Sequence, residues 1–345
     1  MAERRSMLQH SRRDLSHCAA KLKARGIEAR NVKRRAEMAT SLMKKRGLEG
    51  RDITTLLNTT HHSSEDYTTD TPETTIFASN GSCVLSPEVT EGPYYVAGEY
   101  VRQDVVESQA GVAMAIDVQV LDVETCEPVS GAYLEVWHCN STGVYSGVSA
   151  SGNGNSASDT SNLNATFLRG VQPTDADGVA QFDTLFPGHY TGRTTHIHVM
   201  VHLNATPFAN NTLIDTTASH VGQMFFDQDL ITEVEATSVY AANTQTLTTN
   251  AEDSILAEEA ETSDPFMTYV LLGDTVEDGL LAWLAFGVNT TLSKEVSAAA
   301  TFYESGGQAN PNAGGGGPGG SPPSGFPSGG FPSGTGAPPA STSSA

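Results

Sequence analysis

The stretch AMAIDVQVLDV, residues 113–123, decides the fold class of this chain. Met114, Ile116, Val118 and Val120 alternate with smaller or polar neighbours, which is the period of a strand with one buried face. ETCEPVSGA (124–132) predicts a turn, and AYLEVWH (132–138) predicts the next strand. Short strands separated by Gly, Pro and Asn turns favour an all-β sandwich over alternating strands and helices. Further strands are predicted at GVAQFDTLF (178–186), HIHVMVHL (196–203), MTYVLLG (267–273) and LLAWLAFGV (280–288).

The two ends of the 345-residue chain differ from this middle in composition. Residues 1–51 hold 15 of the 19 Lys and Arg, and 12–48 is rich in helix formers and lacks Pro, so we predict a basic helical pre-segment at 1–51. This segment is either a solvated helix or a propeptide with dibasic cleavage sites at Arg34-Arg35 and Lys45-Arg46. We expect a polar linker at 52–78, a β-sandwich domain at 79–304 and a disordered Gly-, Pro- and Ser-rich tail at 305–345.

The charge of the body excludes one class of function. After residue 51 the chain has four basic residues and 35 acidic ones, whereas nucleic-acid binding requires clustered Lys and Arg. No apolar run of 18 residues is present, so we expect no membrane span. Each cation of the body is therefore conspicuous: Arg102, Arg169, Arg193 and Lys294.

Cysteines and glycosylation sequons bear on the compartment. Of the four cysteines, Cys83, Cys126 and Cys139 fall in the predicted domain and could give one bridge and one free thiol, with the connectivity open. The start has charge but no apolar signal-peptide core, which leaves either an intracellular protein or a true start upstream of residue 1. We expect a secreted protein, because N-x-[ST] sequons occur at Asn58, Asn80, Asn140, Asn164, Asn204, Asn210 and Asn289.

The candidate chemistry lies in FPGHYTGRTTHIH, residues 186–198. On a strand at 195–203, His196 and His198 share one face, and two neutral imidazoles in one place suit iron, copper or zinc. Tyr190 ends a Pro-Gly-His-Tyr turn and could point its phenol at the same centre. Arg193 indicates a bound anion beside the metal, and the alternative for it is a salt bridge to one of the many acids.

Four stretches in order carry a resemblance to a known family. They are CVLSPEVTEGPYY (83–95), VWHCNSTGVYS (136–146), FLRGVQPTDADGVAQFDTLFPGHYTGRTTHIH (167–198) and VGQMFFD (221–227). The sequence resembles the intradiol ring-cleavage dioxygenases of the catechol and protocatechuate type, most closely their extracellular fungal members.

The resemblance implies a site and a reaction. Tyr145, Tyr190, His196 and His198 would bind one Fe(III) per chain, with Tyr145 staying on the ion and Tyr190 leaving it when substrate arrives. The substrates would be a small aromatic diol and O2, with cleavage between the two hydroxyl-bearing carbons to a muconate-type diacid. Arg193, Tyr190 and Gln223 would be catalytic, and the substrate would contact Pro93, Tyr94, Arg193 and Gln223.

Alternatives and departures accompany this interpretation. TDADGVAQFDTLFPGHY (174–190) also resembles non-catalytic transthyretin-like binding modules, which need neither R-x-x-H-x-H nor Tyr145. A copper or zinc enzyme built on HxH would usually add carboxylate or Cys ligands. NATPFANNTLIDTTASH (204–220) looks like an insertion that weakens the assignment of Gln223, and the family's N-terminal dimerisation domain is not recognisable, so the oligomeric state is open. We expect Asn140 to carry no glycan or to point away, and His138 and His202 to pack or form hydrogen bonds.

Overall fold

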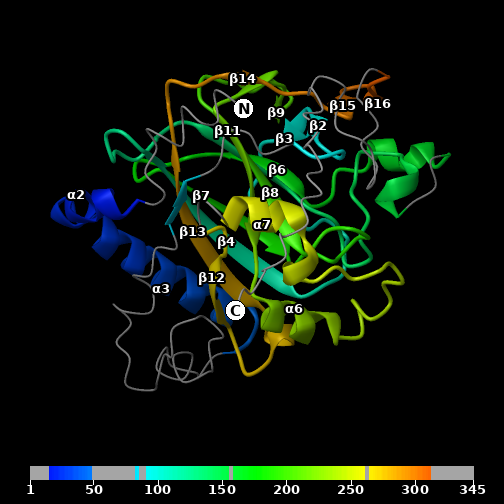
Figure 1. Cartoon of the computed structure of the whole chain (residues 1–345), viewed down its shortest axis with the longest axis horizontal. Helices are drawn as coiled ribbons and strands as arrows, with labels where there is room; N and C mark the ends of the chain where they lie inside the picture. The colour runs from blue at the N-terminus through cyan, green and yellow to red at the C-terminus, as the bar shows by residue number, and fades with distance from the viewer. Residues whose placement is uncertain (1–14, 49–81, 85–90, 155–157, 261–263, 312–345) are drawn as a thin grey trace, which may run out of the picture.

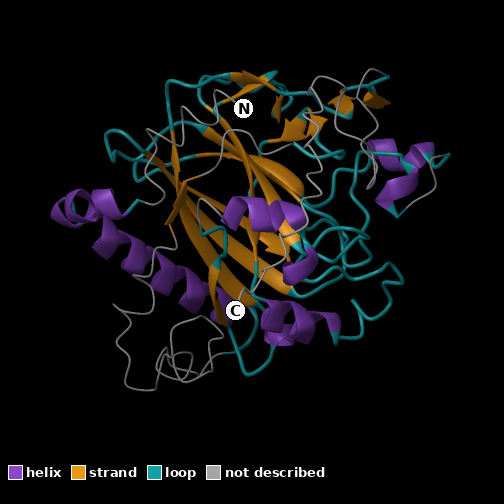
Figure 2. Ribbon diagram, in the orientation of Figure 1, coloured by secondary structure: helices purple, strands orange, loops and turns teal. Residues whose placement is uncertain are grey.

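A computed structural model describes residues 15–48, 82–84, 91–154, 158–260 and 264–311. Strands dominate its centre and helices lie around them, so the predicted all-β sandwich is confirmed (Figure 2). The first sheet has the order β1 (Ser82–Val84), β13 (Leu280–Val288), β4 (Ala113–Asp122), β7 (Val179–Leu185), and β12 (Thr268–Leu271) also pairs with β13. The second is antiparallel throughout, with the order β11 (His220–Phe225), β8 (His196–His202), β5 (Tyr133–Trp137), β6 (Arg169–Pro173).

Shorter elements complete the sandwich. Among the described residues, three small sheets pair β3 (Glu99–Tyr100) with β9 (Thr212–Leu213), β10 (Thr217–Ala218) with β14 (Lys294–Glu295), and β15 (Ala300–Tyr303) with both β2 (Val96–Ala97) and β16 (Gly306–Ala309). The helices are α2 (Ala19–Ala24), α3 (Ile27–Lys45), α6 (Gln228–Glu235) and α7 (Ser254–Ala260). Single 3-10 turns lie at η1 (Ser16–Cys18), η2 (Ser151–Asn153), η3 (Thr160–Asn164), η4 (Asn250–Glu252) and η5 (Val276–Asp278).

The main core lies between the two sheets. Ile116 and Val118 of β4 meet Val136 of β5 and Val199 of β8 there, each at most 1 % exposed. The opposite face of β4 is buried as well, with Asp117 and its neighbours 1 % exposed or less. The prediction that this strand has only one buried face is therefore wrong, because a helix covers the second face.

That helix belongs to the segment 15–48, which we call the N-terminal strap. Its longest helix, α3, begins after Gly26, which has the left-handed φ of 68°, and lies along the first sheet beside β12 and β13 (Figure 1). Ala39 and Leu42 share an apolar cluster with Trp283 of β13. The alternative of a solvated helix is therefore wrong, and removal of the segment as a propeptide stays a prediction.

Paired charges hold the strap on the sheet. Arg34 makes two hydrogen bonds to Asp117 of β4 (2.8 and 2.9 Å), and the fully buried Arg35 makes a third (3.2 Å). Asn31 donates to Gln119 (2.9 Å) on the same strand face. The basic composition of the segment thus serves contacts within the chain.

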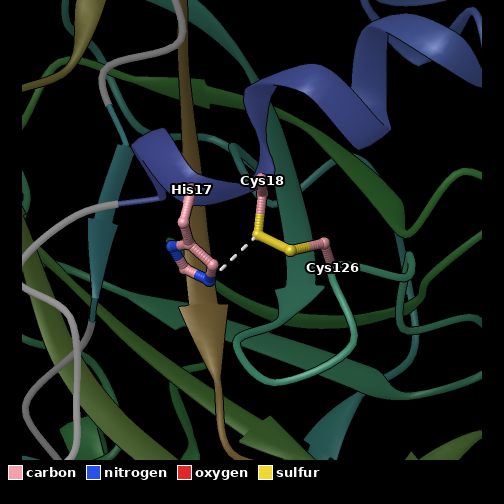
Figure 3. A group of neighbouring side chains, drawn as sticks. All are labelled: His17, Cys18 and Cys126. Carbon is pink, nitrogen blue, oxygen red and sulfur yellow. Dashed lines mark hydrogen bonds between the residues drawn. A yellow bond between two sulfur atoms is a disulfide. The ribbon is translucent and has the colours of Figure 1, made fainter.

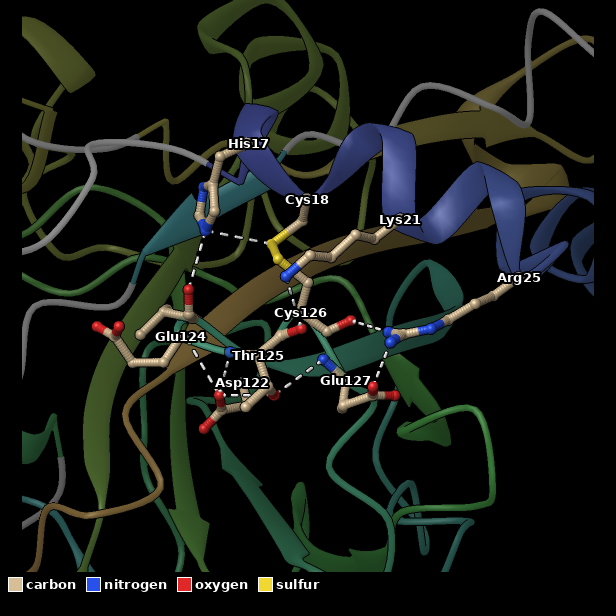
Figure 4. Close-up of a disulfide and its surroundings, with 10 residues drawn as sticks. His17, Cys18, Lys21, Arg25, Asp122, Glu124, Thr125, Cys126 and Glu127 are labelled. Atoms are coloured by element: carbon tan, nitrogen blue, oxygen red, sulfur yellow. Dashed lines mark hydrogen bonds and ion pairs between the residues drawn. A yellow bond between two sulfur atoms is a disulfide. The ribbon is translucent and has the colours of Figure 1, made fainter.

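A disulfide ties the strap to the turn between β4 and β5. Cys18 is bonded to Cys126 with their Cα atoms 5.3 Å apart, and the His17 ring lies beside it (Figure 3). Lys21 and Arg25 donate to the carbonyls of Thr125 and Cys126 around the same bond (Figure 4). The sequence led us to expect a disulfide between two cysteines of the predicted domain. This expectation is wrong, because Cys126 pairs with Cys18 of the strap instead. Among the described side chains, Cys139 is a buried free thiol, and the side chain of Cys83 lies outside them.

The C-terminal boundary also differs from the prediction. Residues 306–309 were predicted to belong to the disordered tail, but they form β16 and pair with β15. Strand pairing uses backbone hydrogen bonds, so this Gly-rich stretch can pair although it has few side chains to bury. The linker 52–78 and residues 312–345 lie outside the described part of the chain. Within the described residues, no helix combines the length and the apolar character that a membrane span requires.

Candidate metal centre

Strand β8 sets the position of the two predicted histidine ligands. It lies between β11 and β5, and its register places His198 opposite Gln223 on one side and Trp137 on the other. The segment 204–220 forms its own short strands with β3 and β14, so β11 pairs with β8 along its whole length. The predicted insertion therefore leaves Gln223 beside the histidines.

Loops position the two tyrosines. The backbone N–H of Tyr145 donates to Asn153 (2.7 Å), and its carbonyl accepts from Asn153 and Asn162 (2.8 Å each). Tyr190 lies in the turn before β8 and forms an isolated β-bridge with Arg193. These backbone contacts direct both phenols towards β8.

The structure brings all four predicted ligands together. The Tyr145 and Tyr190 hydroxyls each lie 3.4 Å from Nε2 of His196, and Nε2 of His198 lies 3.1 Å from the same nitrogen. None of the four residues is more than 4 % exposed. Two phenol oxygens and two imidazole nitrogens thus meet at one buried point.

The protonation of these groups fits a cation at that point. Nδ1 of His196 donates to the Thr194 carbonyl (2.6 Å), so Nε2 carries a bare lone pair directed at the other three donors. Burial and the charge of Arg193 lower the pKa of His196 to about 3, and burial and His196 lower the pKa of His198. Burial raises the pKa of Tyr190 to about 12 and that of Tyr145 as well, so both phenols need a nearby cation to ionise. Neutral imidazoles with potential phenolates make a donor set that suits a hard trivalent ion.

Aromatic rings enclose the centre. Trp137 stacks on His198 with ring centroids 4.8 Å apart and planes 1° apart, and Tyr94 stacks on Tyr145 at 4.8 Å. Gly92 has φ of 73°, and a Cβ there would lie 3.0 Å from His198, so the Gly-Pro-Tyr-Tyr segment must pass close to the ligand. Pro93 is half-buried in this wall, and no hydroxyl partner for Tyr94 is present among the described residues.

Arg193 is held beside the centre by the predicted Gln223 and by Asp253, which the sequence did not reveal. Its Nε donates to Asp253 (2.9 Å) and its Nη2 to the side-chain oxygen of Gln223 (2.5 Å). Asp253 also accepts from the backbone N–H of Thr194, and of Ile255 and Leu256 at the start of α7. The salt bridge and the active-site position, considered as alternatives for Arg193, therefore occur together. The sequence signal available for Asp253 was its position directly before a short helix, where an Asp side chain commonly accepts hydrogen bonds from the first backbone N–H groups.

Histidines of the described segments outside the ligand pair have partners away from the centre or on its periphery. His138 and His202 form hydrogen bonds, as predicted, to Thr184 and Glu135 respectively. His189, next to Tyr190, contacts Glu235 (2.8 Å). Asn140 donates its amide to Gln109 (3.1 Å), and its oxygen closes the local turn, while its glycosylation state stays a prediction.

Comparisons with known proteins identify the family. A family model described as Dioxygenase matches residues 90–266, just over half of the chain. An intradiol ring-cleavage dioxygenase from Tetranychus urticae is 30% identical, and the match covers 60% of this chain and 95% of that one with a TM-score of 0.49. The chain belongs to the intradiol ring-cleavage dioxygenase family.

Curated relatives of this family member are matched over shorter ranges. A catechol 1,2-dioxygenase from Acinetobacter lwoffii is 31% identical over 139 residues, which are 34% of this chain and 42% of that protein. Another from Pseudomonas sp. is 41% identical over 66 residues, 18% of this chain and 22% of its length. The chain thus matches less than half the length of these relatives. The family match contains all four candidate ligands and weighs against a transthyretin-like module, and closeness to fungal members stays a prediction.

Proposed function

We propose that the protein is a non-haem Fe(III) dioxygenase that uses O2 to cleave catechol-type rings between the two hydroxyl-bearing carbons. The observation that carries the proposal is that two phenol oxygens and the imidazole nitrogen of His198 lie within 3.4 Å of Nε2 of His196. Tyr145, Tyr190, His196 and His198 would hold one ferric ion per chain. The ion, when bound, would withdraw electron density from a chelated diol and make its ring reactive towards O2.

The two tyrosines would have different roles. Tyr145 is fully buried and its backbone is fixed on both sides by Asn153 and Asn162, so it would stay in place. Tyr190 lies in a turn and is 4 % exposed, so its hydroxyl oxygen would take one proton from the incoming diol and move aside. A free phenol at that position keeps the proton, because burial raises its pKa to about 12.

Arg193 and Gln223 would bind and polarise the substrate. Among the described residues no group accepts from Nη1 of Arg193, and Nε2 of the buried Gln223 also has no partner. Both nitrogens are therefore available to a substrate oxygen. The pKa of Arg193 is raised, since the tyrosines and Asp253 outweigh the effect of burial, and its charge would stabilise negative charge that develops on the ring. Pro93 and Tyr94 would form the wall that excludes water.

Colour and oxygen uptake test the proposal. Tyrosinate bound to Fe(III) absorbs visible light, so the iron-loaded protein should be red and should consume O2 with catechol or hydroxyquinol. Tyr145→Phe and His198→Ala should lose colour and turnover together, whereas Arg193→Ala should keep the colour and lose turnover. Arg30→Ala removes a cation of the N-terminal strap, outside the centre, and should change neither. A colourless iron-loaded protein would refute the ligand set, and normal turnover by Arg193→Ala would refute its role.

We also propose that the protein acts outside the cell. The Cys18–Cys126 disulfide supports this placement, because such bonds persist in oxidising compartments. Asn164, Asn204 and Asn210 are exposed and could accept glycans. Recovery of the disulfide-bonded, glycosylated protein from the medium of its source cells would bear this out, and recovery only from cell lysates would contradict it.

A further inference from the structure

A second arginine lies beside the centre, behind Tyr145. Arg169 of β6 is 1 % exposed, and its guanidinium carbon lies 5.8 Å from the centroid of the Tyr145 ring. Its Nε and Nη2 donate to the carbonyl of Ser146 (3.0 and 2.8 Å), and Nη2 also donates to the carbonyl of Tyr94 (2.6 Å). Arg169 thus connects the residue after Tyr145 to the residue whose ring stacks on Tyr145.

The charge of Arg169 is incompletely balanced. Its nearest carboxylate is that of Glu99, with Oε1 3.7 Å from Nη1, which is longer than a hydrogen bond. Neither of these two atoms has a hydrogen-bond partner among the described residues. A buried cation whose nearest carboxylate lies beyond hydrogen-bond reach is attracted to the π face beside it, which is that of Tyr145.

We propose that Arg169 is a positioning residue for Tyr145, which fixes the Tyr94–Tyr145 stack and holds a buried positive charge behind the Tyr145 ring. The inference rests on the proposed function, since it concerns the same ferric centre. The two tyrosines therefore have different cations beside them. Arg169 lies behind Tyr145, whereas Arg193 forms a β-bridge with Tyr190. Outer residues of this kind typically change metal affinity by roughly 10- to 100-fold.

The visible band of the iron-loaded protein is the sharpest readout. Its absorption moves an electron from phenolate to iron, and a cation nearer the phenolate makes this transfer harder. Removing the charge should therefore shift the Tyr145 component to longer wavelength. The variant to use is Arg169→Met combined with Glu99→Gln, because it leaves no buried unpaired carboxylate. Arg169→Lys keeps the charge without the planar set of donors. Arg30→Met, which removes a half-exposed cation of the N-terminal strap, is the control.

The expected result is a red-shifted band and Fe(III) affinity weaker by roughly 10- to 100-fold in the Met and Gln double variant, measured by competition with a ferric chelator. Arg169→Lys should keep the band near its normal position, and Arg30→Met should match the parent protein. A double variant with unchanged band and affinity would overturn the proposal, as would a Lys variant shifted equally far.

A third variant covers the case in which the Arg169 variants do not fold. Glu99→Gln alone keeps Arg169 and removes its nearest carboxylate. Because burial raises the pKa of Glu99 to about 8, the comparison is made at pH 9, where this carboxyl is ionised in the parent protein, and the band of the variant should lie at shorter wavelength. A purely structural role for Arg169 predicts no shift, and an unmoved band would overturn the proposal. If the parent protein itself binds iron without a tyrosinate band, the proposed function fails. If the parent protein shows the band and the Arg169 and Glu99 variants do not shift it, only the proposed role of Arg169 fails.

Discussion

Replacing Asp117 by Asn should destabilise the protein far more than the same replacement at Asp177. Both carboxylates receive arginines from α3, but Asp117 is fully buried under the N-terminal strap, whereas Asp177 is 21% exposed and pairs with Arg30, which is 50% exposed. Asp117 accepts from Arg34, Arg35 and Gln181. The two positions therefore give a matched pair on one helix interface.

The structure gives the size of each effect. Burial alone would raise the pKa of Asp117, but the hydrogen bond from Arg34 and the charges of both arginines outweigh it, so its pKa is lowered and it is ionised at neutral pH. The Asp117→Asn substitution would leave the buried charge of Arg35 without this carboxylate, a change that typically costs about 3–5 kcal/mol. Arg35 keeps its position over the Trp283 ring at 5.2 Å, so we expect a value near the lower end, about 3 kcal/mol. An exposed pair such as Arg30 and Asp177 contributes about 0–1 kcal/mol.

The assay is urea unfolding at pH 7 under non-reducing conditions, followed by tryptophan fluorescence, because Trp283 lies in the apolar cluster beneath α3. The difference between Asp117→Asn and the parent protein should also shrink as the pH falls through the lowered pKa of Asp117, since its stabilisation is present only while it is ionised. Equal losses at Asp117 and Asp177, within about 0.5 kcal/mol, would refute the assignment of a buried charge network.

Three further outcomes follow from the described contacts. Asp253→Asn should keep the visible band but reduce kcat by up to about 100-fold, because Arg193 loses the carboxylate that holds its Nε. Steady-state oxygen uptake measures kcat, and an unchanged value would contradict this role. Replacing Cys18 and Cys126 together by Ser should lower the free energy of unfolding by about 4–5 kcal/mol, because the disulfide closes a loop with a sequence separation of 108. A loss below about 1 kcal/mol in urea unfolding would show that the disulfide contributes little to stability. Burial would lower the pKa of His202, but hydrogen bonds to Asp215 and Glu135 outweigh it and raise this pKa from 6.5 to about 10. The parent protein should therefore be more stable than His202→Gln by a margin that is full below pH 6.5, declines above it and vanishes above about pH 10. A margin in the free energy of unfolding that grows with pH would contradict this.

Local patterns predicted the parts of the fold and site that local geometry determines. The alternation in residues 113–123 predicted β4, and the two-residue period of a strand placed His196 and His198 on one face. Family motifs supplied Tyr145 and Gln223, whose positions depend on distant segments. Tyr145 is fixed by Asn153 and Asn162, in a loop that no periodic pattern describes, and Gln223 depends on the register of β11.

Pairings over long sequence distances could not be predicted. Asp253 lies 60 residues after Arg193, and Arg34 lies 83 residues before Asp117. In each case the sequence shows an isolated charge, and only the fold shows its partner. The cysteine prediction failed for the same reason, because it considered bridges within the predicted domain and omitted Cys18 of the strap.

The uneven charge of the sequence therefore has a structural cause. A strongly acidic body and a basic first segment suggested two separate parts, but Arg25, Arg30, Arg34 and Arg35 meet Glu127, Asp177 and Asp117 across one interface. The cations are concentrated in the strap because the covered face of β4 and its neighbouring turns carry the acids. Cleavage after Lys45-Arg46 would not by itself release the strap, since the Cys18–Cys126 bond and the buried pairs of Asp117 all involve strap residues before that site. Activation by removal of this segment would require reduction of the disulfide and exposure of an apolar sheet face, which makes a lasting structural role the stronger interpretation.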